Sequence, residues 1–222
     1  MKQQGGLRGY LGARSVALCL SLVVAAGQAE VMHILRTNPV WLLPAVYVLL
    51  LVLSIVFYDP ESKRPRRTGR RLAQLCIFLM ILANIFIMAL LVRGIFTASL
   101  RIGALDLVLA GAALWLVTLL TFGLAYWEVD GGGPEARRTK LVDFPDFLFP
   151  QQQADPSWHV TKPNWRPGLG DYMYVSLTSA VAFSPTDTMP LTPLAKVLMG
   201  AESLMCFVVF GVLVATAVNI AS

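Results

Sequence analysis

Apolar and polar positions alternate in long blocks along this chain. A helix needs about 20 apolar residues to cross a bilayer, and five apolar stretches approach or exceed that length. They cover residues 15–35, 40–57, 72–92, 102–127 and 191–221. A sixth stretch, residues 172–182, would form a helix only about 16 Å long, which is too short to cross ~30 Å of hydrocarbon. The pattern therefore predicts an all-α integral membrane protein with about five transmembrane helices and a half-helix before the last one.

The same blocks divide the chain into three regions. Residues 1–127 are expected to form a four-helix membrane region, residues 128–170 a polar loop, and residues 171–222 a half-helix, a turn and a final helix. The loop begins with a Gly-Gly-Gly-Pro sequence at residues 131–134, which ends helices. It contains no nucleophile–base pair and no group of metal ligands, so the sequence predicts neither an enzyme nor a cofactor.

The first apolar stretch has two interpretations. Basic residues such as Lys2 and Arg8 precede it, and small residues follow near Gly27, which is the layout of a signal peptide. Alternatively, residues 15–35 are a true first span. We favour the span.

Composition narrows the class of protein. Of the 222 residues, 56% are hydrophobic and 14% are charged, whereas a soluble domain is about 25% charged. Lys and Arg exceed Asp and Glu by five, and much of this excess lies in the loop at residues 58–71. Short basic loops stay in the cytoplasm, so we interpret the charge as an orientation signal and not as a nucleic-acid site.

The basic loop also has a functional interpretation, as a site for anionic lipid headgroups. Its candidate residues are Arg64, Arg66, Arg67, Arg70 and Arg71. We favour orientation alone. With this loop inside, the N-terminus and residues 128–190 are inside as well, and the C-terminus is outside.

Two features of the last region carry candidate chemistry. A polar turn follows the half-helix, and its residues are candidates to line a pore or filter: Phe183, Ser184, Pro185, Thr186 and Asp187. Glu202 lies inside the final apolar stretch, where a carboxylate indicates function. It either faces a water-filled cavity or is a buried or protonated carboxyl bonded to a polar residue such as Asn84. Asp187 is either part of a filter or a turn residue.

The last region resembles the pore module of tetrameric potassium channels. The residues that match are Tyr174 and Ser176 of the half-helix, Asp187 and Pro190 after the filter position, and Ala195 and Lys196 of the inner helix. The Thr-Val-Gly-Tyr-Gly filter is replaced by Ala-Phe-Ser-Pro-Thr at residues 182–186. Both glycines are lost, and non-glycine residues in left-handed conformations cost about 1–2 kcal/mol each, so a potassium-type filter is not expected.

The whole chain also resembles an uncharacterised family of bacterial multi-pass membrane proteins, which implies the inner (plasma) membrane but no activity. Potassium-channel pore loops enter from outside, whereas the basic loop places this one inside. Either the module is inverted, as in ionotropic glutamate receptors, or the number of spans after the basic loop differs from this count.

These observations favour a channel-like homo-oligomer in the lipid bilayer, with a tetramer preferred and monovalent or divalent cations as the permeant species. One alternative is a non-conducting membrane protein that is structural or binds a partner or lipid. A secondary transporter is a weaker alternative, because the chain lacks paired broken segments in two halves.

Overall fold

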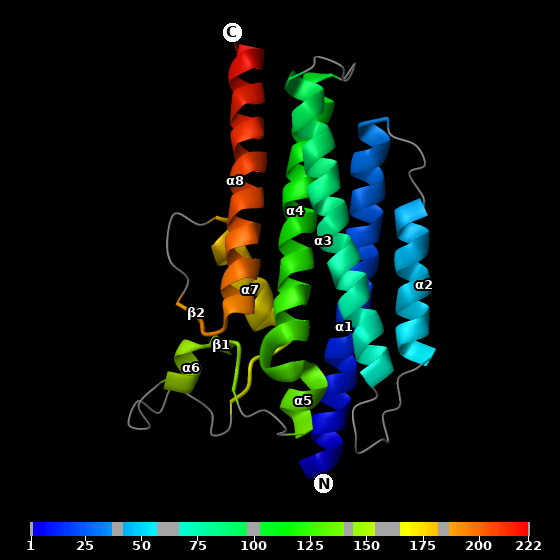
Figure 1. Ribbon diagram of the computed structural model, residues 1–222, viewed down its shortest axis with the longest axis vertical. Coiled ribbons are helices and arrows are strands. Elements are labelled where there is room, and N and C mark those ends of the chain that lie inside the picture. The colour runs from blue at the N-terminus through cyan, green and yellow to red at the C-terminus, as the bar shows by residue number, and fades with distance from the viewer. Residues whose placement is uncertain are drawn as a thin grey trace.

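The computed structural model describes residues 2–36, 42–56, 67–96, 103–139, 144–153, 165–181 and 187–221 (Figure 1). The chain is predominantly helical, as the apolar blocks predict. Its longer helices are α1 (Lys2–Ile34), α2 (Leu42–Val56), α3 (Arg67–Phe96), α4 (Ala104–Val129), α7 (Leu169–Ala180) and α8 (Pro193–Ala221).

Short elements lie between α4 and α8. They are the 3₁₀ turn η1 (Asp130–Gly132), the helices α5 (Pro134–Thr139) and α6 (Pro150–Gln153), and the strands β1 (Phe147–Leu148) and β2 (Met189–Pro190). The two strands pair antiparallel, with Phe147 opposite Pro190 and Leu148 opposite Met189. The region that the sequence predicts as a polar loop thus contains ordered elements, and β1 joins it to the segment before α8.

Four of the described helices contain a stretch that is long and apolar enough to cross a membrane. These stretches are Arg14–Ile34, Gly69–Phe96, Ala104–Gly132 and Pro193–Thr216. They correspond to four of the five predicted spans. The remaining predicted span is α2, whose 15 residues would extend only about 22 Å.

Helix α4 occupies the centre of the bundle, where it contacts α1, α3, α7 and α8. Its sequence is apolar on all sides, which is typical of a helix surrounded by protein, and its residues from Thr118 to Glu128 are nearly all buried. Helix α8 is equally apolar but exposes Leu204, Phe207 and Phe210 on its outer face. Figure 1 shows the N-terminus, α5, α6 and the strand pair at one end of the bundle and the C-terminus at the other.

Two aromatic residues at the end of α4 lie deeper than their position predicts. Tyr126 and Trp127 close an apolar block, a pattern typical of side chains at a membrane–water interface. In the structure Tyr126 is fully buried and Trp127 is 6% exposed. Both side chains therefore contact protein, because α1, α7 and the strand pair cover this part of α4.

A ladder of polar side chains joins α1, α3 and α4. The Gln28 amide donates to the Asn84 side-chain oxygen over 2.7 Å, and the Asn84 amide donates to Thr121 Oγ1 over 3.2 Å. All three residues are fully buried. Asn84 therefore faces protein, as its place near the middle of an apolar block predicts, because an amide in hydrocarbon requires a partner.

Two threonines of α4 offer a matched test of this ladder. Thr121 and Thr118 are both buried and both donate to the carbonyl four residues earlier, but only Thr121 also accepts from Asn84. We expect Thr121→Val to destabilise the bundle by about 0.5–2 kcal/mol more than Thr118→Val, the usual range for an interhelical hydrogen bond in a membrane protein. Reversible unfolding in mixed micelles measures both variants. Equal stability of the two would show that the contact with Asn84 contributes nothing.

Candidate functional site

Helix α7 packs along the C-terminal half of α4 with one face buried. Tyr172, Val175, Ser176 and Ser179 form this face, with spacings of three and four residues that are typical of a helix stripe. Leu177 and Val181 lie on the outer side and are exposed. A polar and aromatic face is therefore turned inward and an aliphatic face outward.

The start of α7 differs from the prediction in one detail. The apolar stretch predicts a half-helix over residues 172–182, which Asp171 would precede as its cap. The helix begins at Leu169, and the Asp171 carboxylate accepts the backbone N–H of Gly168 over 2.7 Å from within the first turn. A carboxylate there also complements the helix dipole.

Helix α7 runs from one end of α4 to its middle. Tyr172 bonds Asp130 just past the end of α4, Ser176 bonds the carbonyl of Leu119, and Val181 lines the same groove as Trp115. From residue 130 to residue 115, α4 rises about 22 Å. Strand β2 then lies back at the starting end, where Leu191 donates its N–H to the carbonyl of Asp146 over 2.8 Å.

Close contact between α4 and α7 depends on Gly123. A Cβ atom at this position would lie 2.5 Å from Met173 Sδ and 3.3 Å from Met173 Cα. The absence of a side chain therefore lets the backbone of α7 approach α4 and brings Ser176 within reach of the Leu119 carbonyl.

Asp130 organises the entry to α7. Its Oδ1 accepts the backbone N–H groups of Asp146, over 2.7 Å, and Phe147, over 3.1 Å. Its Oδ2 accepts the hydroxyl of Tyr172 and lies 3.8 Å from the guanidinium of Arg137. Asp130 is 1% exposed, so these four donors replace the water that a carboxylate requires.

Arg137 and Asp146 extend this cluster. Arg137 donates to the carbonyls of Trp127, over 2.8 Å, and Asp130, and its guanidinium carbon lies 5.0 Å from the centre of the Tyr172 ring. Asp146 accepts the N–H of Gly131 over 2.9 Å and the hydroxyl of Thr192 over 2.6 Å. Burial, as the main cause, raises the pKa of the Tyr172 phenol above its ordinary value, which keeps it a donor to Asp130.

The turn after α4 requires glycine. Residues 131–133 have φ angles of 54°, 81° and 92°, in the left-handed region that glycine adopts without a steric cost. A Cβ at Gly133 would also lie 3.0 Å from the carbonyl oxygen of Glu128. The glycines end α4 as the sequence predicts and reverse the chain so that Asp146 reaches Gly131.

Glu202 lies at a second polar cluster, deeper along α7. Its side chain is fully buried, its Oε2 accepts the hydroxyl of Tyr126 from α4, and its Oε1 contacts the hydroxyl of Ser176 from α7. The Ser176 hydroxyl also lies 2.7 Å from the carbonyl oxygen of Leu119. Glu202 therefore joins α4, α7 and α8 inside one chain.

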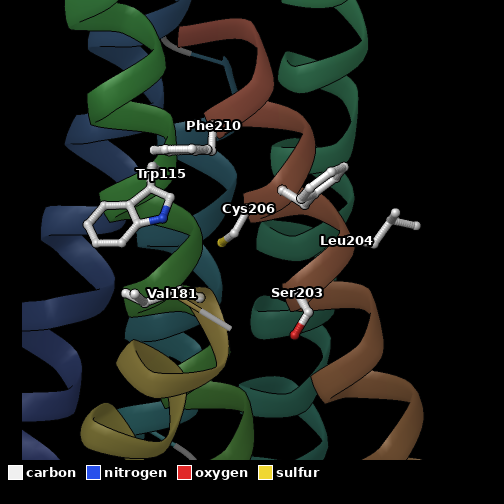
Figure 2. Close-up of a pocket in the computed structure, with 8 residues that line it drawn as sticks. Trp115, Val181, Ser203, Leu204, Cys206 and Phe210 are labelled. Carbon is white, nitrogen blue, oxygen red and sulfur yellow. The ribbon is translucent and has the colours of Figure 1, made fainter. Parts of the chain in front are cut away.

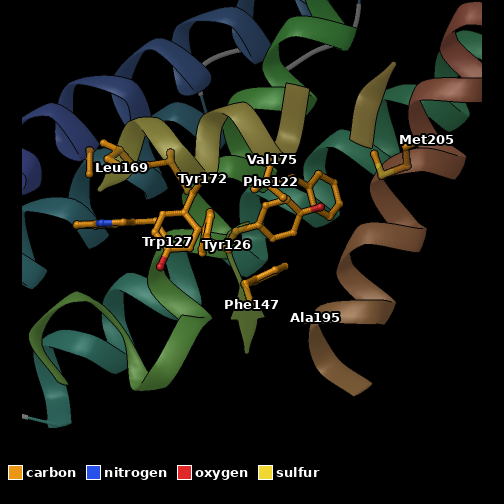
Figure 3. Close-up of a cluster of buried hydrophobic side chains, with 12 residues drawn as sticks. Phe122, Tyr126, Trp127, Phe147, Leu169, Tyr172, Val175, Ala195 and Met205 are labelled. Carbon is orange, nitrogen blue, oxygen red and sulfur yellow. The ribbon is translucent and has the colours of Figure 1, made fainter. Parts of the chain in front are cut away.

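An aromatic cluster fills the space between the two acids. The rings of Tyr126 and Phe147 are 5.1 Å apart, those of Phe147 and Tyr172 are 6.3 Å apart, and those of Phe149 and Tyr172 are 5.3 Å apart. Figure 3 shows Tyr126, Phe147 and Tyr172 gathered between α4, α7 and β1. Such ring pairs contribute about 0.5–1.5 kcal/mol each beyond their burial, so the strand pair helps to hold α7 in place.

A groove of about 550 Å³ lies where α7 ends. Its lining is mostly apolar and comes from α4, α7 and α8: Trp115, Ala180, Val181, Ser203, Leu204, Cys206, Phe207 and Phe210. Figure 2 shows Trp115 and Phe210 at one end of the groove and Val181 and Ser203 at the other. The Ser203 hydroxyl donates to the Ser179 carbonyl over 3.1 Å, which gives α7 and α8 a second polar contact.

The predicted pore residues are described only in part. Phe183, Ser184, Pro185 and Thr186 lie outside the described residues. Asp187 is described and is exposed, two residues before β2. Glu202 has the buried environment of our second interpretation, with Ser176 and Tyr126 as partners in place of Asn84.

The candidate headgroup arginines are likewise divided. Arg64 and Arg66 lie outside the described residues, and Arg67 begins α3. Arg71 is exposed at the end of the bundle, whereas Arg70 is half-buried beside the glycine turn, with Nε 3.3 Å from a Cβ placed on Gly133. Of Arg70 and Arg71, Arg71 has the exposure that contact with a headgroup requires.

Sequence reasoning missed the residues that hold α7. Asp130, Arg137, Asp146 and Tyr172 were all assigned to a loop or to an apolar block. Asp130 could have been found from the sequence, because a charged residue directly before three glycines suggests a side chain that organises the turn. No local signal identifies its partners, because they follow it by up to 42 residues.

By fold, the chain is a helical bundle whose long helices have the length and apolarity of membrane spans. No family model, curated protein or solved structure matches this chain.

The Asp130 cluster predicts the cost of removing one charge. In Asp130→Asn, a neutral amide replaces the carboxylate, so the bonds to Tyr172 and Arg137 weaken. A hydrogen bond to a charged group contributes about 1.5–3 kcal/mol, and we expect a destabilisation of that size. Asp187→Asn is the control, because this exposed aspartate lies near the same end and surface changes usually cost less than about 0.5 kcal/mol. Thermal unfolding in detergent measures both, and equal melting temperatures would contradict the role of Asp130.

Proposed function

We propose that this protein is an ion-channel-like membrane protein in which α7, the turn after it and α8 form a pore-type module. In this proposal α7 is a re-entrant half-helix, the chain crosses the membrane about five times with α2 as the shortest span, and copies assemble around the module. Cations are the permeant species, attracted by Asp187 at the entrance.

One observation carries the proposal. Helix α7 follows α4 from its end to its middle, and the chain is back at the same end by β2. A half-helix with a returning segment survives at membrane depth only where protein buries it or where it borders water. The buried face of α7 and the charged cluster at its entry supply that protection on the inner side, and its exposed outer face is available to neighbouring copies.

The charges of the described residues support one orientation. Most described lysine and arginine residues lie toward the end where α7 begins, on its neighbouring elements or just before it: Lys2, Arg8, Arg14, Arg67, Arg70, Arg71, Arg137, Arg138, Arg166 and Lys196. Arg36 and Arg93 lie toward the opposite end. Because basic residues remain in the cytoplasm, the half-helix would enter from the cytoplasmic side.

Reporter fusions test this orientation. We expect a reporter joined at Ser222 to be active outside the cytoplasm and one inserted at Arg67 to be active inside it. We expect this because most described basic residues lie at the end that contains Arg67. Alkaline phosphatase fusions report an outside position, and green fluorescent protein fusions report a cytoplasmic one. A cytoplasmic signal at Ser222 would contradict the proposed orientation.

Ion flux in liposomes tests conduction. We expect purified protein to release a cation gradient and Asp187→Asn to slow this flux severalfold, because a ring of carboxylates concentrates cations. Asp106→Asn is the matched control, since Asp106 is also exposed but lies at the start of α4, toward the other end. Absence of flux from the wild-type protein would reject conduction, and equal flux in both variants would remove Asp187 from the path.

A second function has a specific observation in its favour. Glu202 is completely buried by α4 and α7 of its own chain, so α7 is held without help from other copies. This favours a non-conducting membrane module that is structural or binds a partner or lipid. Stoichiometry separates the two, because a monomer in nanodiscs has no central pore.

A further inference from the structure

We infer that Glu202 is a neutral carboxylic acid in the folded protein and that it links α8 to α7 by donating its proton in a hydrogen bond to Ser176. The inference depends on the contacts between α4, α7 and α8 and is independent of ion conduction. It assigns a proton-binding site to the Glu202, Ser176 and Tyr126 cluster.

Counting protons leads to this assignment. The hydroxyl of Ser176 has one proton and lies within hydrogen-bonding distance of two oxygens, Glu202 Oε1 and the Leu119 carbonyl. The carbonyl has no proton to donate, so Ser176 must donate to it or leave two acceptors 2.7 Å apart. The contact between Ser176 and Glu202 then requires a proton on Glu202 Oε1.

With that proton in place, every group in the cluster is satisfied. Glu202 donates to Ser176, Ser176 donates to the Leu119 carbonyl, and Tyr126 donates to Glu202 Oε2. An ionised Glu202 would leave one acceptor–acceptor contact and a fully buried charge, which is costly without a paired cation. None of the described lysine, arginine or histidine residues forms an ion pair with it.

Asp130 provides the contrast within the same chain. It is equally buried, but its partners are two backbone N–H groups, a phenol and a guanidinium, all of which donate. Four donors suit an ionised carboxylate, whereas Glu202 has one uncommitted donor, the Tyr126 hydroxyl. The two acids of the α7 site therefore carry different charges.

The groups that face Glu202 define what a rise in pH would change. Tyr126 faces it from α4, Ser176 from α7 and Cys206 from its own helix. Loss of the proton would remove the bond from Glu202 to Ser176 and place a charge between α7 and α8. The cluster therefore holds α7 while Glu202 is protonated and releases it as the pH rises.

Infrared spectroscopy of the protein in bilayers tests the proton directly. At neutral pH we expect a carboxylic C=O band that shifts in heavy water, is missing in Glu202→Gln and persists in Asp130→Asn. Ser176→Ala should move this band to higher frequency, because the acid loses its acceptor. Ser203→Ala is the matched control, since Ser203 bonds α7 through the Ser179 carbonyl without touching Glu202, and it should leave the band in place.

Two results would overturn the assignment. The first is a wild-type spectrum that equals that of Glu202→Gln, whether both contain the carboxylic C=O band or both lack it. The other is a band that Ser176→Ala does not shift, and this variant decides alone if Glu202→Gln does not fold.

Thiol labelling tests the release of α7. Cys206 is 1% exposed beside the end of α7. Over the pH range in which the carboxylic C=O band of Glu202 disappears, we expect Cys206 to react severalfold faster in the wild-type protein than in Glu202→Gln at the same pH. At equal pH an ionised Glu202 disfavours the neighbouring Cys206 thiolate and so slows labelling of the wild-type protein, which means that a faster wild-type rate reports the release of α7. Buried Cys76 of α3 reports on general unfolding. Equal Cys206 rates in the two proteins would contradict the release.

Discussion

The structure depends on how a short helix with polar side chains is buried between two apolar ones. Helix α7 turns the hydroxyls of Tyr172 and Ser176 inward, and each needs a partner because burying an unpaired hydroxyl costs about 1–3 kcal/mol. Acidic side chains meet this requirement at two levels. Asp130 at the end of α4 accepts the hydroxyl of Tyr172. Glu202 within α8 donates to Ser176, which donates in turn to the Leu119 carbonyl.

The two buried acids, Asp130 and Glu202, have different kinds of partners. Asp130 gathers donors from Asp146, β1, α5 and α7, so that it organises the whole entry region around a negative charge. Glu202 has little besides hydroxyls around it, and a neutral acid fits that environment. One end of α7 is thus held by a charged network near the end of the bundle, and its middle is held by a chain of hydroxyl bonds at depth.

This arrangement also explains why α4 and α8 expose different amounts of surface. Helix α4 is surrounded by α1, α3, α7 and α8, and its polar residues Thr118, Thr121 and Tyr126 all face protein. Helix α8 meets protein on one side and leaves Leu204, Phe207 and Phe210 exposed on the other. That outer face and the groove beside it are the surfaces that lipid or neighbouring copies would contact.

The sequence by itself determined the helices, because their backbone hydrogen bonds are local and their apolar blocks are continuous. It also determined the end of α4, since three successive glycines can adopt positive φ angles, and the protein-facing position of Asn84. Only the tertiary structure decided which polar groups meet. Glu202 bonds residues 26 and 76 positions away, and Asp130 bonds one 42 positions away. No local pattern encodes such pairs, because the packing of α7 against α4 and α8 brings them together. The same packing buries Tyr126 and Trp127, which local pattern placed at the membrane surface.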